Sequence, residues 1–132
     1  MNHADRIWDR ALDMDGDDGA ARVGDGALRD VLRLHGMAMN GGLLHAVEGL
    51  EPEELDGAVT GFRWLGLEDL ADAVTAYAAD AADAEGMPDD AVDALEERGN
   101  DLYSDAVPED EVLYAAFHRR FTAQPEAFAP LG

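Results

Sequence analysis

Eight acidic residues in the second half of the chain follow two regular spacings, and their chemistry is that of a charged surface. Asp69, Asp72, Asp80 and Asp83 form the first set, and Asp90, Asp93, Glu97 and Asp101 form the second. With 3.6 residues per turn, each set falls within a narrow band along one side of an α-helix. Such a band is a row of negative charge, and we predict that the two rows bind a positively charged partner.

The sequence lacks the motifs of common catalytic and cofactor sites. It has no G-x-S-x-G, no P-loop, no H-E-x-x-H and no cysteine. Its four histidines, at positions 3, 35, 45 and 118, are never three to five residues apart, the spacing of two ligands of one metal. His35 and His45 flank two glycines and leave a shared site as an alternative, although we expect His35 in the core or at its boundary. We therefore predict no enzymatic activity, no cofactor and no metal site.

Residues 13–24 have the composition of a calcium loop without its pattern. An EF-hand loop that began at Asp13 would need glycine at its sixth position and glutamate at its twelfth. Asp18 and Gly24 occupy these positions. We interpret the segment as an acidic linker, with a weak calcium site as the alternative.

Acidic residues greatly outnumber basic ones. The 132 residues include 30 Asp and Glu, nine arginines and no lysine, which gives a formal net charge of −21. Such a surface repels nucleic acid phosphates and anionic lipids, so we predict neither direct nucleic acid binding nor membrane binding. It attracts basic proteins at rates that fall as salt rises. A GC-rich coding bias and adaptation to a cytoplasm of high salt would each produce the same acidity, and both alternatives stay open.

The composition fits one domain with its own hydrophobic core. Apolar residues make up 47% of the chain, but no apolar run approaches the roughly 18 residues that span a bilayer. The start of the chain lacks a basic segment followed by an apolar one, as a signal peptide would have. We therefore expect a soluble, cytoplasmic protein, either a monomer or a homodimer.

Helical periodicity begins near residue 27 and continues almost to the end of the chain. The predicted helices cover residues 27–40, 43–50, 52–65, 67–84, 88–103 and 108–122. Three of them start with a proline and acidic residues, which suit the first turn of a helix, and Gly41 and Gly42 suit a helix end. The pattern predicts an all-α, compact single-domain bundle of about six helices. We expect residues 52–65 to be the buried central helix, because they are apolar or small nearly all round.

The two ends of the chain are predicted to pack differently. Residues 1–25 are expected to form a short helix, docked through Trp8, and an acidic Gly/Asp linker, whereas residues 26–132 form the domain. Near the other end, Phe128 is expected to pack back onto the core.

The segment Asn40-Gly41-Gly42-Leu43-Leu44-His45 resembles the Asn-Gly-Gly-(aromatic or Leu)-x-(Gln or His) motif of the bacterial family typified by DNA mimic protein 19. The order of the later helices over about residues 27–128 is also similar. The resemblance implies an all-α fold with Asn40, Gly41, Gly42 and His45 as the family motif. The type member of that family presents carboxylates that imitate DNA phosphates and engages a DNA-binding regulator.

Two hypotheses follow from these patterns. In the first, the chain is an acidic decoy that binds a basic DNA-binding regulator or neutralises a basic toxin nuclease through the two rows. In the second, it is a structural or small-molecule-binding domain whose acidity reflects solubility or high-salt adaptation. The first predicts capture of a basic protein that DNA competes away and that salt abolishes.

Overall fold

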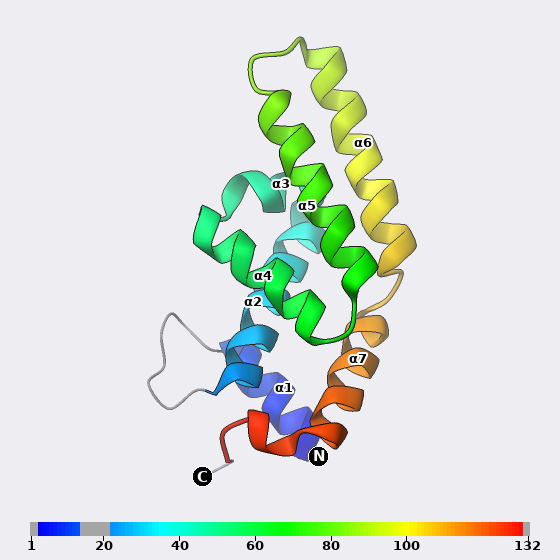
Figure 1. Ribbon diagram of the computed structural model, residues 1–132. Coiled ribbons are helices and arrows are strands. Elements are labelled where there is room, and N and C mark those ends of the chain that lie inside the picture. Colours follow the sequence, from blue (N-terminus) through cyan, green and yellow to red (C-terminus); the bar gives the residue numbers. More distant parts are fainter. Residues whose placement is uncertain (1–2, 14–21, 131–132) are drawn as a thin grey trace.

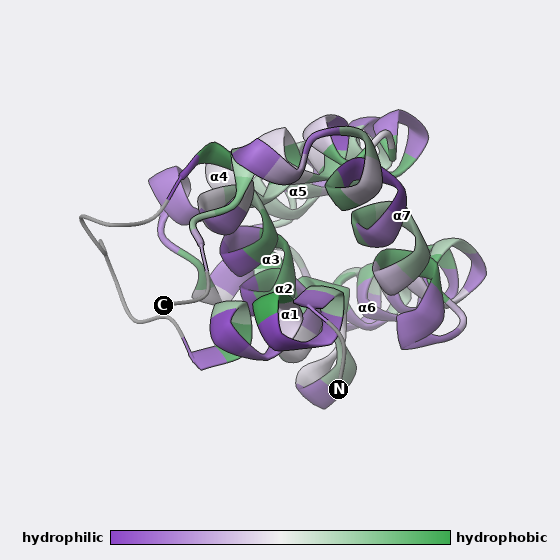
Figure 2. Ribbon diagram, turned by 90° about the horizontal axis from the view of Figure 1, so that it is seen from below, coloured by the Kyte–Doolittle hydropathy of each residue, from purple (hydrophilic) through white to green (hydrophobic). Residues whose placement is uncertain are grey.

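The computed structural model describes residues 3–13 and 22–130, which form seven α-helices, one short 3-10 helix and no β-strand (Figure 1). The helices are α1 (His3–Asp13), α2 (Val23–Gly41), α3 (Leu43–Gly49), α4 (Pro52–Trp64), α5 (Glu68–Asp83), α6 (Asp89–Ala106) and α7 (Asp110–Ala123), followed by the 3-10 helix η1 (Pro125–Ala127). Hydrophobic residues lie toward the inside of the bundle and hydrophilic ones toward the outside (Figure 2). The predicted all-α fold is confirmed.

The central helix is α2, and not residues 52–65 as the sequence had indicated. Eight residues of α2 are buried, and the helix packs against α1, α3 and α4. Only three residues of α4 are buried, and Asp56 and Thr60 on its outer side are exposed. The small residues of α4 instead allow α4 to cross α2 at a short distance. A Cβ at Gly61 would lie 2.7 Å from the carbonyl oxygen of Ala27 in α2.

Most predicted helix ends lie within a few residues of the observed ones. Helix α2 ends at Gly41, as the Asn-Gly-Gly segment predicts, and Gly42 follows with a φ of +94°, a conformation that favours glycine. The N–H of Gly42 donates to the carbonyl oxygen of Ala38 (2.8 Å). Helix α6 continues three residues beyond the predicted end at Tyr103. Helix α2 begins at Val23, within the segment expected to be linker.

Helix α1 packs against α7 through aromatic side chains. The ring of Trp8 lies 5.3 Å from that of Tyr114 and 5.8 Å from that of Phe117, so the predicted docking through Trp8 is confirmed. Phe128 is buried against Phe117, as predicted. Residues 14–21 lie outside the described part of the chain, and with them most of the predicted acidic linker and calcium loop.

A hydrogen bond between α1 and α7 is expected to make the stability of the fold decrease at alkaline pH. The hydroxyl of Tyr114 donates to Oδ1 of Asp5 (2.5 Å), and this bond, with burial, raises the pKa of Tyr114 from 10.0 to about 12. The folded state therefore binds this proton more tightly than the unfolded state does. We expect its contribution to stability to be complete below pH 10 and to be lost as the pH rises toward 12. Urea unfolding across this pH range measures the loss of unfolding free energy, which should be smaller in Tyr114→Phe. An equal loss in Tyr114→Phe and in the unmodified protein would contradict this prediction.

Helices α5 and α6 form an antiparallel hairpin that extends away from α1 and η1 (Figure 1). The hydroxyl of Tyr77 in α5 donates to the carbonyl oxygen of Leu95 in α6 (2.8 Å). Gly99 lies on the inner side of α6, where a Cβ would collide with the Tyr77 hydroxyl. The absence of a side chain at Gly99 therefore allows the two helices to approach.

We expect Gly99→Ala to destabilise the protein by about 1–3 kcal/mol, because the added methyl group overpacks the contact with Tyr77. In a Tyr77→Phe background the hydroxyl oxygen is absent and the ring carbons, the nearest 2.5 Å from the added Cβ, remain, so the same substitution should still destabilise the protein but cost about 1 kcal/mol less. Urea unfolding of the four proteins in this double-mutant cycle tests the contact. Equal costs in both backgrounds would show that the hydroxyl does not set the helix separation.

Candidate acidic interface

The two predicted rows lie on the outside of the α5–α6 hairpin. All eight side chains are exposed: Asp69, Asp72, Asp80 and Asp83, here called the α5 row, and Asp90, Asp93, Glu97 and Asp101, called the α6 row. At 1.5 Å rise per residue the α5 row is about 21 Å long and the α6 row about 16 Å. The inner sides of the two helices hold the apolar residues that the sequence had assigned to the core, including Val74 and Leu95.

Arginines of the same chain neutralise two of the eight carboxylates. Arg63 of α4 donates to Asp72 (2.6 Å), and Arg98 of α6 donates to Asp80 (2.7 Å). Both pairs are exposed to solvent, so their net contribution to stability is small. Within residues 3–13 and 22–130, the other six carboxylates of the rows form no ion pair.

The charge of the chain is unevenly distributed. Residues 68–106, which include the hairpin, have thirteen acidic side chains and one arginine, Arg98. The other eight arginines belong to the rest of the chain, where they partly offset seventeen acidic residues. Among these, Arg120 donates to the carbonyl oxygen of Trp64 and lies over its ring, 4.7 Å from the ring centre. The hairpin is thus the part of the protein with the largest excess of negative charge.

No family model, curated protein or solved structure matches this chain significantly. The similarity to the DNA mimic family therefore stays a prediction from the Asn-Gly-Gly segment and the order of helices.

The Asn-Gly-Gly segment lines a cavity of about 330 Å³ between the end of α2 and the last turns of α6. Asn40, Gly41 and Gly42 form one side of this cavity, here called the polar cavity, and Asn100 and Ser104 belong to the other. A Cβ at position 42 would lie 2.5 Å from Oδ1 of Asn100, so Gly42 permits this close approach. The fourth motif residue, His45, is exposed and does not line the cavity.

Behind the polar cavity, a chain of hydrogen bonds joins three helices. His35 of α2 lies between the hydroxyl of Tyr103 at Nδ1 and the carboxylate of Asp110 at Nε2, each at 2.7 Å. A carboxylate only accepts, so Nε2–H donates to Asp110 and Nδ1 accepts from Tyr103. Burial and the charge of Asp110 raise the pKa of Tyr103, which keeps its hydroxyl protonated. This arrangement disfavours a tyrosinate nucleophile and ties α2, α6 and α7 together.

His35 is buried, as the sequence predicted. No direct contact joins it to His45 among the described residues, so the structure does not bring the two histidines into one site. The same part of the chain contains no group of three or more metal-binding side chains, and none of its helices is long and apolar enough to cross a membrane.

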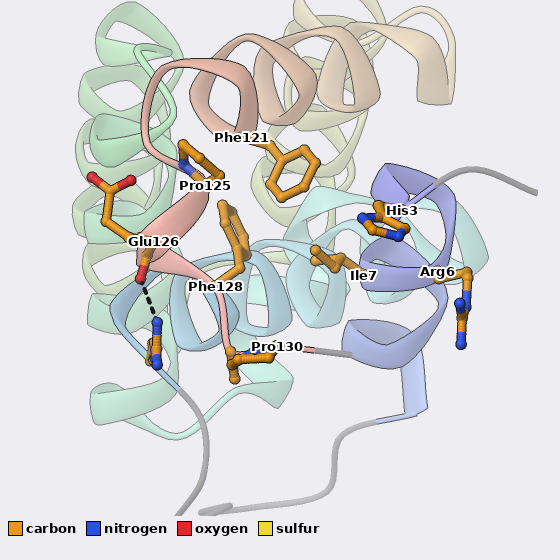
Figure 3. Close-up of a pocket in the computed structure, with 10 residues that line it drawn as sticks. His3, Arg6, Ile7, Phe121, Pro125, Glu126, Phe128 and Pro130 are labelled. Atoms are coloured by element: carbon orange, nitrogen blue, oxygen red, sulfur yellow. Dashed lines mark hydrogen bonds between the residues drawn. The ribbon is translucent and has the colours of Figure 1, made fainter. Parts of the chain in front are cut away.

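A second cavity, of about 450 Å³, lies between α1 and η1 (Figure 3), and these elements are at the end of the molecule opposite the hairpin (Figure 1). Arg6, Arg22 and His3 line it together with one acidic residue, Glu126, and the rings of Phe121 and Phe128. Arg22 also donates to the carbonyl oxygen of Glu126 (3.0 Å). No local spacing in the sequence indicates this basic cavity, because it joins residues about one hundred positions apart.

Proposed function

We propose that the chain is a non-enzymatic binding protein whose α5–α6 hairpin imitates the charge of DNA and engages a basic DNA-binding protein. The observation that supports this most is the separation of charge. Thirteen acidic residues accompany one arginine in residues 68–106, and six row carboxylates lack an ion pair within the described residues. Their negative charge therefore stays available to a partner.

Some dimensions of the hairpin are similar to those of a DNA duplex, and others are not. DNA carries one negative charge per about 1.7 Å of axis, so the rows are sparser than a phosphate backbone. Packed helices lie about 8–10 Å apart, so the axes of α5 and α6 are separated by a distance similar to the width of a DNA groove. A protein whose arginines and lysines follow the two backbones of a groove could contact both rows together.

The proposed partner is a basic regulator or a basic nuclease, because both present such a surface to duplex DNA. A cytoplasmic location would bring the chain together with either. One observation favours the alternative, in which the acidity serves only solubility or high-salt adaptation. Asp72 and Asp80 pair with arginines of the same chain. A binding experiment separates the two hypotheses.

The test is retention of basic proteins by the immobilised chain at about 50 mM salt, where electrostatic attraction extends over more than 10 Å. We expect DNA-binding proteins to be retained, to be released by a 30-base-pair duplex, and to be lost by about 0.3 M salt. An acidic protein of similar net charge and different fold is the control. Equal retention by that control, or no release by duplex, would contradict DNA mimicry and favour the solubility hypothesis.

A further inference from the structure

The polar cavity has free hydrogen-bonding groups and no charged side chain in its lining. Asn40, Asn100 and Ser104 line it, and their side chains have no hydrogen-bond partner within residues 3–13 and 22–130. Leu43 and Val107 contribute apolar atoms to its wall. A group that enters this cavity can therefore form several new hydrogen bonds and also bury an apolar stem.

Three helix ends meet at the cavity. The last turns of α2 and of α6 line it with the negative ends of their dipoles, and Leu43, the first residue of α3, lines it at the positive end of that helix. Since Gly41 and Gly42 have no side chains, they contribute main-chain atoms to the wall. The excess of negative charge in residues 68–106, with Asp101 of the α6 row adjacent in sequence to Asn100, favours a positively charged donor over an anion. The basic cavity near Arg6 and Arg22 has the opposite character.

The cavity continues the α6 row. Ser104 follows Asp101 by three residues, as Asp93 follows Asp90, and Asn100 follows Glu97 by three. At these steps the side chains share one side of α6. A partner that lies along the α6 row therefore reaches the cavity at the end of the row.

We infer that the polar cavity takes a guanidinium group, supplied by an arginine side chain of the basic partner; the source of the group rests on the proposed function above. A guanidinium has five N–H donors in a planar fork and an apolar stem, which suits several acceptors in an apolar wall. An ammonium is a more strongly hydrated point charge with three donors, and suits this lining less well. The volume of about 330 Å³ is that of a small ligand site.

The direct test uses blocked amino acids as ligands and follows the backbone amides of Gly41 and Gly42 by NMR. We expect N-acetyl-arginine methylamide to shift these signals and to bind at least about fivefold more tightly than its lysine analogue. The citrulline analogue has nearly the same shape without charge and should bind about tenfold more weakly than arginine. Equal binding of arginine and citrulline would overturn the inference, since the cavity would then not select a cation.

Two variants of Asn100 give effects of opposite sign. Asn100→Asp keeps the shape and adds a negative charge, so we expect arginine to bind about three- to tenfold more tightly, whereas Asn100→Ala should weaken it about fivefold. Gln124→Glu, which adds the same charge in an exposed position at the end of α7, is the matched control and should change binding less than twofold. If Asn100→Asp behaves as this control does, the cavity is not the site. Circular dichroism checks that each variant is folded. Ser104→Ala, which removes a different hydrogen-bonding group from the cavity wall, is an independent test of whether the cavity binds arginine.

A pair of peptides separates this inference from the proposed function. We expect nona-arginine to bind the protein at least about tenfold more tightly than nona-lysine, and Asn100→Ala to remove most of the difference. Equal binding of the two peptides, with no effect of Asn100→Ala, would overturn the cavity inference and leave the proposed function standing. Binding of blocked arginine in the cavity without DNA-sensitive binding of any basic protein would contradict the proposed function and leave only a small-ligand site.

Discussion

Replacing four unpaired carboxylates of the two rows by amides is expected to weaken binding of a fluorescent nona-arginine peptide about tenfold at 50 mM salt. The variant combines Asp83→Asn, Asp93→Asn, Glu97→Gln and Asp101→Asn. Each exposed charge contributes only a few tenths of a kcal/mol, but four contributions along one surface add to about 1.4 kcal/mol, or a factor of ten. Fluorescence anisotropy measures the affinity. The difference from the unmodified protein should largely disappear at 0.5 M salt, because screening removes the interaction.

The control changes the same net charge elsewhere. It combines four exposed residues outside the hairpin, Asp9→Asn, Asp13→Asn, Glu53→Gln and Asp56→Asn. Both variants have a formal net charge of −17 in place of −21. We expect the control to bind the peptide within about twofold of the unmodified protein, since charges beyond a Debye length are screened. Equal losses in the two variants would show that the peptide responds to total charge and that the hairpin is not a distinct site.

The sequence predicted the hairpin well because its information is local. Apolar residues such as Val74 and Leu95 repeat at helical spacing, and the carboxylates fall on the opposite side, so one periodicity determines both the core side and the exposed rows. Proline and acidic residues identified the helix starts, and Asn40 with its two glycines identified the end of α2. None of these predictions depends on a contact with a distant part of the chain.

The prediction that residues 52–65 form the central helix was wrong. Composition does not distinguish a helix that is buried on all sides from one that crosses a neighbouring helix closely on one side. Gly57 and Gly61 made residues 52–65 look apolar or small all round, but both glycines lie where α4 approaches α2. A Cβ at Gly57 would lie 2.5 Å from Oδ2 of Asp30, and one at Gly61 would lie 2.8 Å from Cγ2 of Val31. The spacing of four between the glycines indicates a crossing, but not which helix is crossed.

The polar contacts that join distant segments could not be predicted from the sequence. His35 meets Tyr103 across 68 positions, and the polar cavity combines the end of α2 with the end of α6. Asp25 appeared to be one more acidic residue of a linker. In the structure it is only 2% exposed and binds a residue 104 positions away. A single carboxylate has no periodicity, so its burial depends on the completed fold.

The second large effect is expected at Asp25, where Asp25→Ala should destabilise the protein by about 2–4 kcal/mol. Its carboxylate accepts hydrogen bonds from the guanidinium of Arg10 (2.6 Å) and from the backbone N–H groups of Arg22 (2.9 Å) and Ala129 (2.8 Å). These bonds join α1, the first turn of α2 and the segment after η1. Alanine would leave three donors without this acceptor in a largely buried position. Urea unfolding followed by circular dichroism at 222 nm measures the cost.

Asp72 provides the matched comparison for Asp25, because the same type of ion pair forms at the same distance with a different burial. Asp72 pairs with Arg63 at 2.6 Å, but its side chain is 66% exposed against 2% for Asp25. Asp72→Ala should therefore cost less than about 1 kcal/mol. Asp25→Asn should fall between the two, since its amide oxygen can still accept the two N–H groups while its NH2 faces the donors of Arg10. Similar costs for Asp25→Ala and Asp72→Ala would contradict the role of burial. In that case the buried ion pair would add no more to stability than the exposed one, and the segment after η1 would be held by the packing of Phe128 instead.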